Sequence, residues 1–236
     1  FADESCPAPG MPRIPTSFFI DTLSRRLGLR VTLADAAALA TGEWLKPDNG
    51  LLILACGEAF PLEALDDLKR FLASGGAVLA TAGVPFSHLL APAQDGGFHD
   101  LGASEDERRG ATYFLYSRLG FLTKVATLLD TDTPAGAVTV NWPDSNLPTS
   151  WPLTGGTTSV FLAGNGLSPR TVRPLVVSVS REGRVLSCPV SFSPVLARFP
   201  KARFLSIGFS GDSHPLNPAA WDHAEDALVA FTRLLL

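Results

Sequence analysis

The stretch from Gly50 to Phe86 constrains the fold most, because it alternates buried strands with an amphipathic helix. Leu51 to Ala55 is a short apolar run of the kind that forms a strand buried on both faces. Gly75-Gly76 supplies a left-handed helix stop, and residues 77–81 form the next apolar run. Between the two runs, apolar residues at spacings of three and four predict a helix that begins near a proline: Pro61, Leu62, Leu65, Leu68, Phe71 and Leu72. The stretch therefore predicts one right-handed βαβ unit.

The remaining elements are predicted from the same two periodicities. A helix begins near Thr16 or Ser17, either of which can cap it, and ends at Gly28. A final helix is predicted with Asn217 as its cap and Pro218 at its first position. Residues 34–40 suggest a helical turn, and residues 113–129 fit either a helix or a strand. Short apolar runs between turn residues predict further strands at 29–33, 157–163, 175–180, 184–190 and 202–209.

This order of elements predicts the fold class. We expect an α/β fold, a flavodoxin-like three-layer sandwich with a mostly parallel sheet and a small β-rich insertion in the second half. Residues 1–236 are expected to form a single domain, with a loop excursion near 92–110 and the β-rich insertion near 134–190.

Composition excludes several classes of protein. The chain is 46% hydrophobic and 18% charged, and its net charge of −4 argues against a nucleic-acid binder. It contains no apolar run of 18 residues, so no membrane span is expected. The cysteines and histidines lack metal-ligand spacing, and no glycine-rich loop joins a strand to a helix, so we expect no metal and no cofactor. The compartment stays open: cytoplasmic, or secreted or periplasmic in a bacterium.

Candidate site residues gather at the predicted carboxyl ends of the strands, where ligands bind in parallel sheets. These candidates are Asp3, Glu4, Cys56, Gly57, Glu58, Ala82, Gly83, Asp212 and His214. Cys56 and His214 can be read as a nucleophile and its base, or Cys56 as an apolar filler at a strand end. Glu58 can act as a general base or accept a hydrogen bond from a turn amide.

Two further features suggest ligand binding. Trp142 and Trp151 flank a polar loop, where they either stack on sugar rings or pack the loop onto the domain. Between Ser145 and Gly211, basic residues outnumber the single acid Glu182, which suggests an anionic ligand or a solvated face: Arg170, Arg173, Arg181, Arg184, Arg198, Lys201 and Arg203.

The segment LLILACGEAFPLEALDDLKRFLASGGAVLATAGVPF resembles the class I glutamine amidotransferase-like superfamily. It is similar, more narrowly, to the amidotransferase-like modules of large bacterial glycosidases and to the β-galactosidase trimerisation domain. The resemblance covers residues 1–86 and the chain from Arg203 onward. It implies that Ala82 stands where active members carry the nucleophilic cysteine. It also implies that His214-Pro215-Leu216 keeps the family's histidine without its acidic partner, so glutamine hydrolysis is not expected.

Three functions follow as hypotheses. The leading one is a non-catalytic amidotransferase-like module that acts in assembly, or shapes a neighbouring active site, in a glycoside hydrolase-type protein. Its partners would be other domains or subunits of a larger protein, or further copies of the chain in a homo-oligomer. The alternatives are a small hydrolase or lyase that uses Cys56, Glu58 and His214, and a sugar- or anion-binding domain.

Overall fold

The computed structural model describes residues 14–46, 48, 50–55, 59–81, 86, 88–101, 123–128, 136–140, 147–151, 157–162, 172–196, 198–209 and 214–236. For residues 88, 123–128, 136, 137, 151, 157–162, 186 and 187 the description is limited to the backbone.

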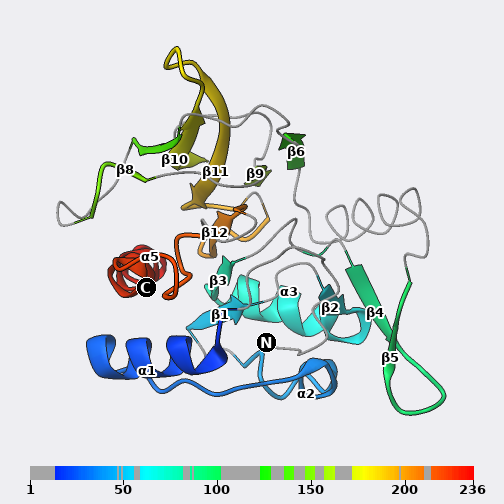
Figure 1. Cartoon of the computed structure of the whole chain (residues 1–236). Coiled ribbons are helices and arrows are strands. Elements are labelled where there is room, and N and C mark those ends of the chain that lie inside the picture. Colours follow the sequence, from blue (N-terminus) through cyan, green and yellow to red (C-terminus); the bar gives the residue numbers. More distant parts are fainter. Residues whose placement is uncertain are drawn as a thin grey trace.

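A seven-stranded mixed sheet forms the centre of the described structure (Figure 1). β1 pairs with β3 and β3 with β12 in parallel, whereas the four remaining pairings are antiparallel. In spatial order the strands are β1 (Leu51–Leu54), β3 (Ala77–Ala80), β12 (Arg203–Ile207), β11 (Val185–Ser193), β10 (Arg173–Val179), β7 (Gly136–Thr139) and β8 (Ser150–Trp151).

The prediction of a flavodoxin-like three-layer sandwich is therefore wrong. Within the main sheet, parallel pairing is confined to β1, β3 and β12, and the segment predicted as a small insertion supplies four strands of that sheet. Arg181-Glu182-Gly183 forms the turn of a hairpin between β10 and β11, with Gly183 at φ 78°. The two apolar runs of this hairpin look the same in sequence whether they pair only with each other or also with β12. The local pattern therefore did not reveal the larger sheet.

The elements predicted between residues 50 and 86 are confirmed, with one addition. The helical part consists of the 3-10 turn η1 (Leu62–Ala64) and α3 (Leu65–Ala73), and the apolar stripe of α3 is buried. After α3, the amide of Gly76 donates to the carbonyl of Phe71 at 3.0 Å, and β3 follows directly. The addition is β2 (Ala59–Pro61), so Pro61 ends a strand before the helical turn begins.

The helix boundaries differ in part from the predictions. α1 (Thr16–Leu27) begins after Pro15 without a side-chain cap and ends at Gly28 with φ 66°, as predicted. α2 (Ala36–Ala40) is capped by the Asp35 carboxylate, which accepts from the amide of Ala38 at 2.7 Å. Residues 29–33, predicted as a strand, form no strand.

The final helix, α5 (Ala224–Leu235), begins later than predicted. The Asn217 side chain accepts from the amide of Ala219 at 3.1 Å, and its carbonyl accepts from the amide of Trp221 at 3.0 Å. These bonds close a separate turn before the helix. Asn217 and Pro218 therefore begin this turn and not the helix.

Two hydrophobic cores cover opposite faces of β1, β3 and β12, because alternate residues of a strand point to opposite faces. We call them the α3 core and the α5 core. Val78, Ala80 and Phe204 face the α3 core with α2, η1 and α3. Leu79 and Leu205 face the α5 core with α1 and α5, which lie next to each other in Figure 1. Salt bridges join these two helices at the surface, Arg25 to Glu225 at 2.6 Å and Arg26 to Asp226 at 2.8 Å.

Two small sheets flank the main one. β2 pairs with β4 (His88–Pro92), which pairs with β5 (Phe98–Asp100), so the predicted loop near 92–110 contains a strand; residues 102–110 lie outside the description. β6 (Thr123–Leu128) pairs with β9 (Thr157–Leu162), which makes 123–128 a strand. Within the described residues, no helix has the length and apolarity needed to cross a membrane.

Candidate functional site

A buried hydrogen-bond network centred on Thr81 joins the carboxyl ends of β1 and β3 to a segment that follows β12. Thr81 follows β3 directly and is fully buried. Its amide donates to the carbonyl of Leu54 at the end of β1, at 3.1 Å. Its hydroxyl lies 3.1 Å from the same carbonyl and 3.0 Å from the carbonyl of Ala55. The carboxyl ends of β1 and β3 are thereby fixed to each other.

His214 extends this network to the segment that follows β12. Its Nε2 forms a short hydrogen bond with the carbonyl of Thr81. Its Nδ1 accepts a hydrogen bond from the amide of Leu216 at 3.0 Å, and its own carbonyl accepts from the amide of Asn217 at 2.9 Å. The imidazole therefore has a backbone partner on each ring nitrogen and is fully buried.

The partners of the imidazole set its tautomer and its charge. An amide can only donate, so Nδ1 carries the lone pair, and the proton sits on Nε2, which donates to the Thr81 carbonyl. Burial lowers the pKa of His214 to about 4, against the opposing effect of the Thr81 hydrogen bond. At neutral pH His214 is a neutral Nε2–H imidazole.

This arrangement leaves His214 poorly suited to general-base chemistry. A base needs a lone pair within reach of the proton that it removes. The lone pair on Nδ1 is occupied by the amide of Leu216, and Nε2 carries the proton given to Thr81. What the geometry does provide is a link between the end of β3 and the segment 214–217.

A strained aromatic residue, Phe86, packs in the α3 core. Phe86 has φ 62°, a left-handed value that is uncommon for a bulky side chain. Its ring lies 5.3 Å from that of Phe60 and 6.3 Å from that of Phe204, between centroids. The two aromatic contacts and full burial hold Phe86 in this conformation.

The other predicted site residues lie largely outside the description. Nothing is described of Asp3, Glu4, Cys56, Gly57, Glu58, Ala82, Gly83, Trp142 or Asp212. Trp151 is the last residue of β8, with its side chain outside the description. The pairing of Cys56 with His214 therefore stays a prediction, and so do the sugar-binding roles of the two tryptophans.

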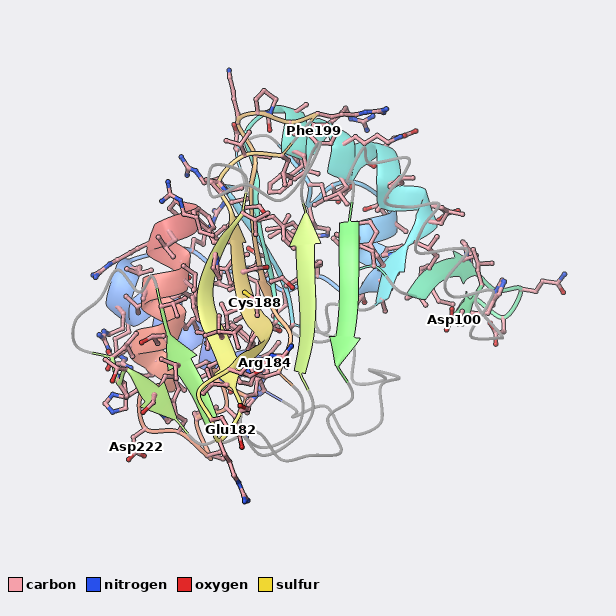
Figure 2. All side chains as sticks on the ribbon, turned by 90° about the horizontal axis from the view of Figure 1, so that it is seen from above. Asp100, Glu182, Arg184, Cys188, Phe199 and Asp222 are labelled. Carbon is pink, nitrogen blue, oxygen red and sulfur yellow. The ribbon has the colours of Figure 1, made fainter. Side chains whose placement is uncertain are left out.

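Among the basic residues of the second half, Arg203 has a structural partner. Its guanidinium donates to the carbonyls of Leu235 and Leu236 at 2.7 and 3.0 Å, which holds the end of α5 against β12. Arg181 and Arg184 are exposed at the turn between β10 and β11. Figure 2 labels Arg184 and Glu182 at this hairpin. Arg170 lies outside the description.

Cys188 is buried in β11, within the main sheet in Figure 2. Burial raises the pKa of the Cys188 thiol to about 12, so it stays protonated and unreactive at neutral pH. Among the residues with described positions, no group of three or more His, Cys, Asp or Glu side chains is placed to hold a metal ion.

Thr81 is the site residue that sequence reasoning missed. The sequence pattern places it only at the end of the run 77–81. The available signal was a hydroxyl residue directly after a fully apolar run, since a buried hydroxyl needs a hydrogen-bond partner.

The comparisons with known proteins give structural neighbours. No family model and no curated protein matches this sequence, so the resemblance to the glutamine amidotransferase-like superfamily is not confirmed by them. The cytoplasmic protein STM3548 from Salmonella typhimurium is similar over 92% of this chain and 85% of its own, with 12% identity and a TM-score of 0.54. The cytoplasmic protein STM1381 from Salmonella typhimurium LT2 is similar over 93% and 86%, with 12% identity and a TM-score of 0.50. At these identities the likeness shows a shared fold alone.

The structural neighbours also include glycoside hydrolases. Gan42B, a GH42 β-galactosidase from G. stearothermophilus, is similar over 98% of this chain, with 13% identity and a TM-score of 0.47. The chain spans 27% of the length of that galactosidase. A TM-score below 0.5 carries no argument about the function of this chain.

Proposed function

We propose that this chain is a non-catalytic module of a carbohydrate-active, glycoside hydrolase-type protein, in which it serves assembly or shapes a neighbouring active site. The observation that supports a non-catalytic role is the fully buried imidazole of His214, whose two nitrogens are both bonded to backbone groups. In this proposal the histidine ties strand ends together and does not transfer protons.

The position of the expected nucleophile supports the same proposal. In the resemblance drawn from the sequence, the nucleophile turn begins immediately after β3, where this chain has Thr81 followed by Ala82. Without a thiol or hydroxyl at position 82, that turn cannot form an acyl-enzyme. The carbohydrate-active context also comes from that sequence resemblance.

The proposal assigns the partners to other domains or subunits of a larger protein, including further copies of this chain. A module of this kind acts through its surface, so its strand ends need only be rigid. The Thr81–His214 network supplies that rigidity, because each buried polar group in it has a partner.

Hydrolase activity of the purified chain tests the proposal. Glutamine, nitrophenyl esters and nitrophenyl glycosides would be offered to the wild-type chain, to His214→Ala and to Cys56→Ser. His99→Ala, at an exposed position in β5, is the matched control. We expect no turnover above the rate in buffer for any of the four proteins. Turnover by the wild type and by His99→Ala that is lost in both His214→Ala and Cys56→Ser would support the small-hydrolase alternative and overturn the proposal.

A further inference from the structure

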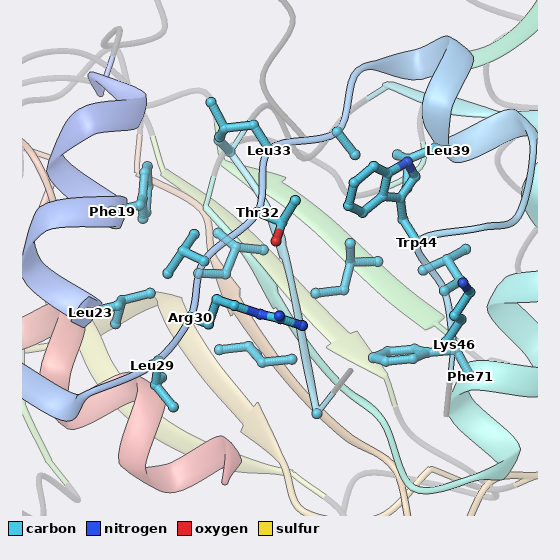
Figure 3. A pocket seen from close by; sticks show the side chains of 18 of the residues that line it. Phe19, Leu23, Leu29, Arg30, Thr32, Leu33, Leu39, Trp44, Lys46 and Phe71 are labelled. Atoms are coloured by element: carbon cyan, nitrogen blue, oxygen red, sulfur yellow. The ribbon is translucent and has the colours of Figure 1, made fainter. Parts of the chain in front are cut away.

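A cavity of about 490 Å³ lies along the edge of β1 that faces away from β3 (Figure 3). Residues from both faces of β1 line it, together with α1, the segment 29–34 and the chain after α2. Neither Thr81 nor His214 lines this cavity. An inference about it therefore does not rest on the proposed function.

The walls of the cavity are mainly apolar. Phe19 and Leu23 from α1 and Phe71 from α3 are buried side chains that border it. Leu51 and Ile53 of β1 also line it and are half-buried. Sites for small molecules are typically concave and mostly apolar, with volumes of about 300 to 1,000 Å³. The size and lining of this cavity fall within that description.

Two basic side chains, Arg30 and Lys46, line the cavity where they can meet an anionic ligand. Figure 3 shows Arg30 extending across the cavity from the segment after α1, with Thr32 beside it and Lys46 on the opposite side. Within the described part of the chain, neither Arg30 nor Lys46 forms a salt bridge. Glu43 and Asp48 line the same cavity. The charges of these four side chains sum to zero. The preference of the cavity for an anionic ligand therefore comes from the central position of Arg30 and not from net charge.

We infer that this cavity binds a small molecule with an apolar body and one anionic group, such as a medium-chain or aromatic carboxylate. The apolar body packs against Leu51 and Ile53 of β1, whose side chains are half-buried. The carboxylate pairs with the guanidinium of Arg30, whose planar donors match its two oxygens. The hydroxyl of Thr32 supplies a further donor beside the same group.

The sequence carries a signal for this arrangement. Residues 29–33, which were predicted to form a strand, alternate apolar and polar side chains. In the structure the segment is not a strand, yet Leu29 and Val31 pack against the α5 core, and Arg30 and Thr32 are exposed. All five residues line the cavity. The alternation thus leaves Arg30 and Thr32 exposed there, while Leu29 and Val31 anchor the segment.

Binding to the full chain tests the inference, with 8-anilinonaphthalene-1-sulfonate as a fluorescent apolar anion and decanoate as its competitor. We expect saturable binding at one site, displacement by decanoate, and at least tenfold weaker displacement by 1-decanol, which lacks the charge. Arg30→Gln should weaken decanoate binding at least fivefold. Arg184→Gln, at the exposed hairpin turn, is the matched control and should bind as the wild type does.

A second variant tests the position of the site. Leu51→Trp places a larger side chain at a half-buried position of the cavity wall and should abolish binding. Cooperative unfolding of each variant would establish that it is folded. Absence of saturable binding to the wild type, equal affinity in Arg30→Gln and Arg184→Gln, or equal displacement by decanol and decanoate would each overturn the inference.

Discussion

At the level of single residues, the imidazole of His214 accepts a hydrogen bond on one nitrogen and donates on the other. The effect of a substitution at position 214 on the free energy of unfolding should therefore depend on which of these bonds the new side chain keeps. Asparagine can reproduce the acceptor at Nδ1, and glutamine can reach the position of Nε2 and donate to Thr81. Alanine keeps neither bond and leaves two buried backbone groups without a partner. That loss costs about 2 to 4 kcal/mol of unfolding free energy.

The lowered pKa of His214 predicts how stability depends on pH. The folded-state pKa is about 4, whereas an unfolded histidine titrates near 6.5, so the unfolded chain binds the proton first as the pH falls. The contribution to stability is complete above pH 6.5 and is lost as the pH falls toward 4. It amounts to about 3 kcal/mol, at roughly 1.4 kcal/mol for each pKa unit. Urea unfolding at pH 7.5 and pH 4.5 measures this loss.

His214→Gln is the reference for that experiment, because it removes the titrating group at position 214 and leaves all carboxylates and all other histidines in place. The wild type should lose more stability than the variant over this pH range. Equal losses in both proteins would contradict a depressed pKa at His214.

At the level of elements, the turn between α3 and β3 depends on a close approach of Gly76 to Phe71. A Cβ atom at Gly76 would overlap the Phe71 ring, which is fully buried. Gly76→Ala should therefore lower the unfolding free energy by about 1 to 3 kcal/mol through overpacking.

Gly28→Ala is the matched control for this turn. A Cβ atom there meets nothing within 4 Å, so its cost comes only from the left-handed φ of 66°. That cost is about 1 kcal/mol. Denaturant unfolding of both variants tests the order; a larger loss at Gly28 than at Gly76 would contradict the close packing of Gly76 on Phe71.

The elements also show what the sequence was able to predict. Periodicity identified α3 and β3 because their apolar residues are buried in the pattern that those spacings require. The same reasoning predicted a strand at 29–33, where Leu29 and Val31 do pack inward although the backbone does not pair as a strand. At Asn217, a residue that closes a turn was predicted to cap a helix. Asparagine serves in both roles, so the sequence alone does not distinguish them.

At the level of the whole molecule, pairing between distant strands determines the fold. β12 lies between β3, a parallel neighbour, and β11, an antiparallel one. Each strand was recognisable alone, but no local pattern predicts that β11, from the hairpin of β10 and β11, pairs with β12. The strand-end network was likewise beyond prediction, because Thr81 and His214 are far apart in sequence. The sequence did place His214 at this end of the sheet.

The central strands predict where the molecule resists opening. β3 and β12 have neighbours on both sides and are covered by a core on each face, so their amides should open only with global unfolding. In hydrogen exchange, Leu79 and Leu205 should be among the slowest amides, and those of β5, an outer strand of a small sheet with two exposed residues, much faster. Comparable protection in β5 would contradict this distribution of stability.

The most direct test of the account is nitrogen-15 NMR of the histidine side chains, with His214 assigned by its loss in His214→Gln. The account predicts that the His214 ring stays a neutral Nε2–H tautomer from pH 8 down to about pH 5, in keeping with its pKa of about 4. A ring that titrates near pH 6.5, or that carries its proton on Nδ1, would show that the strand-end network does not hold it. His214 would then be available for catalysis.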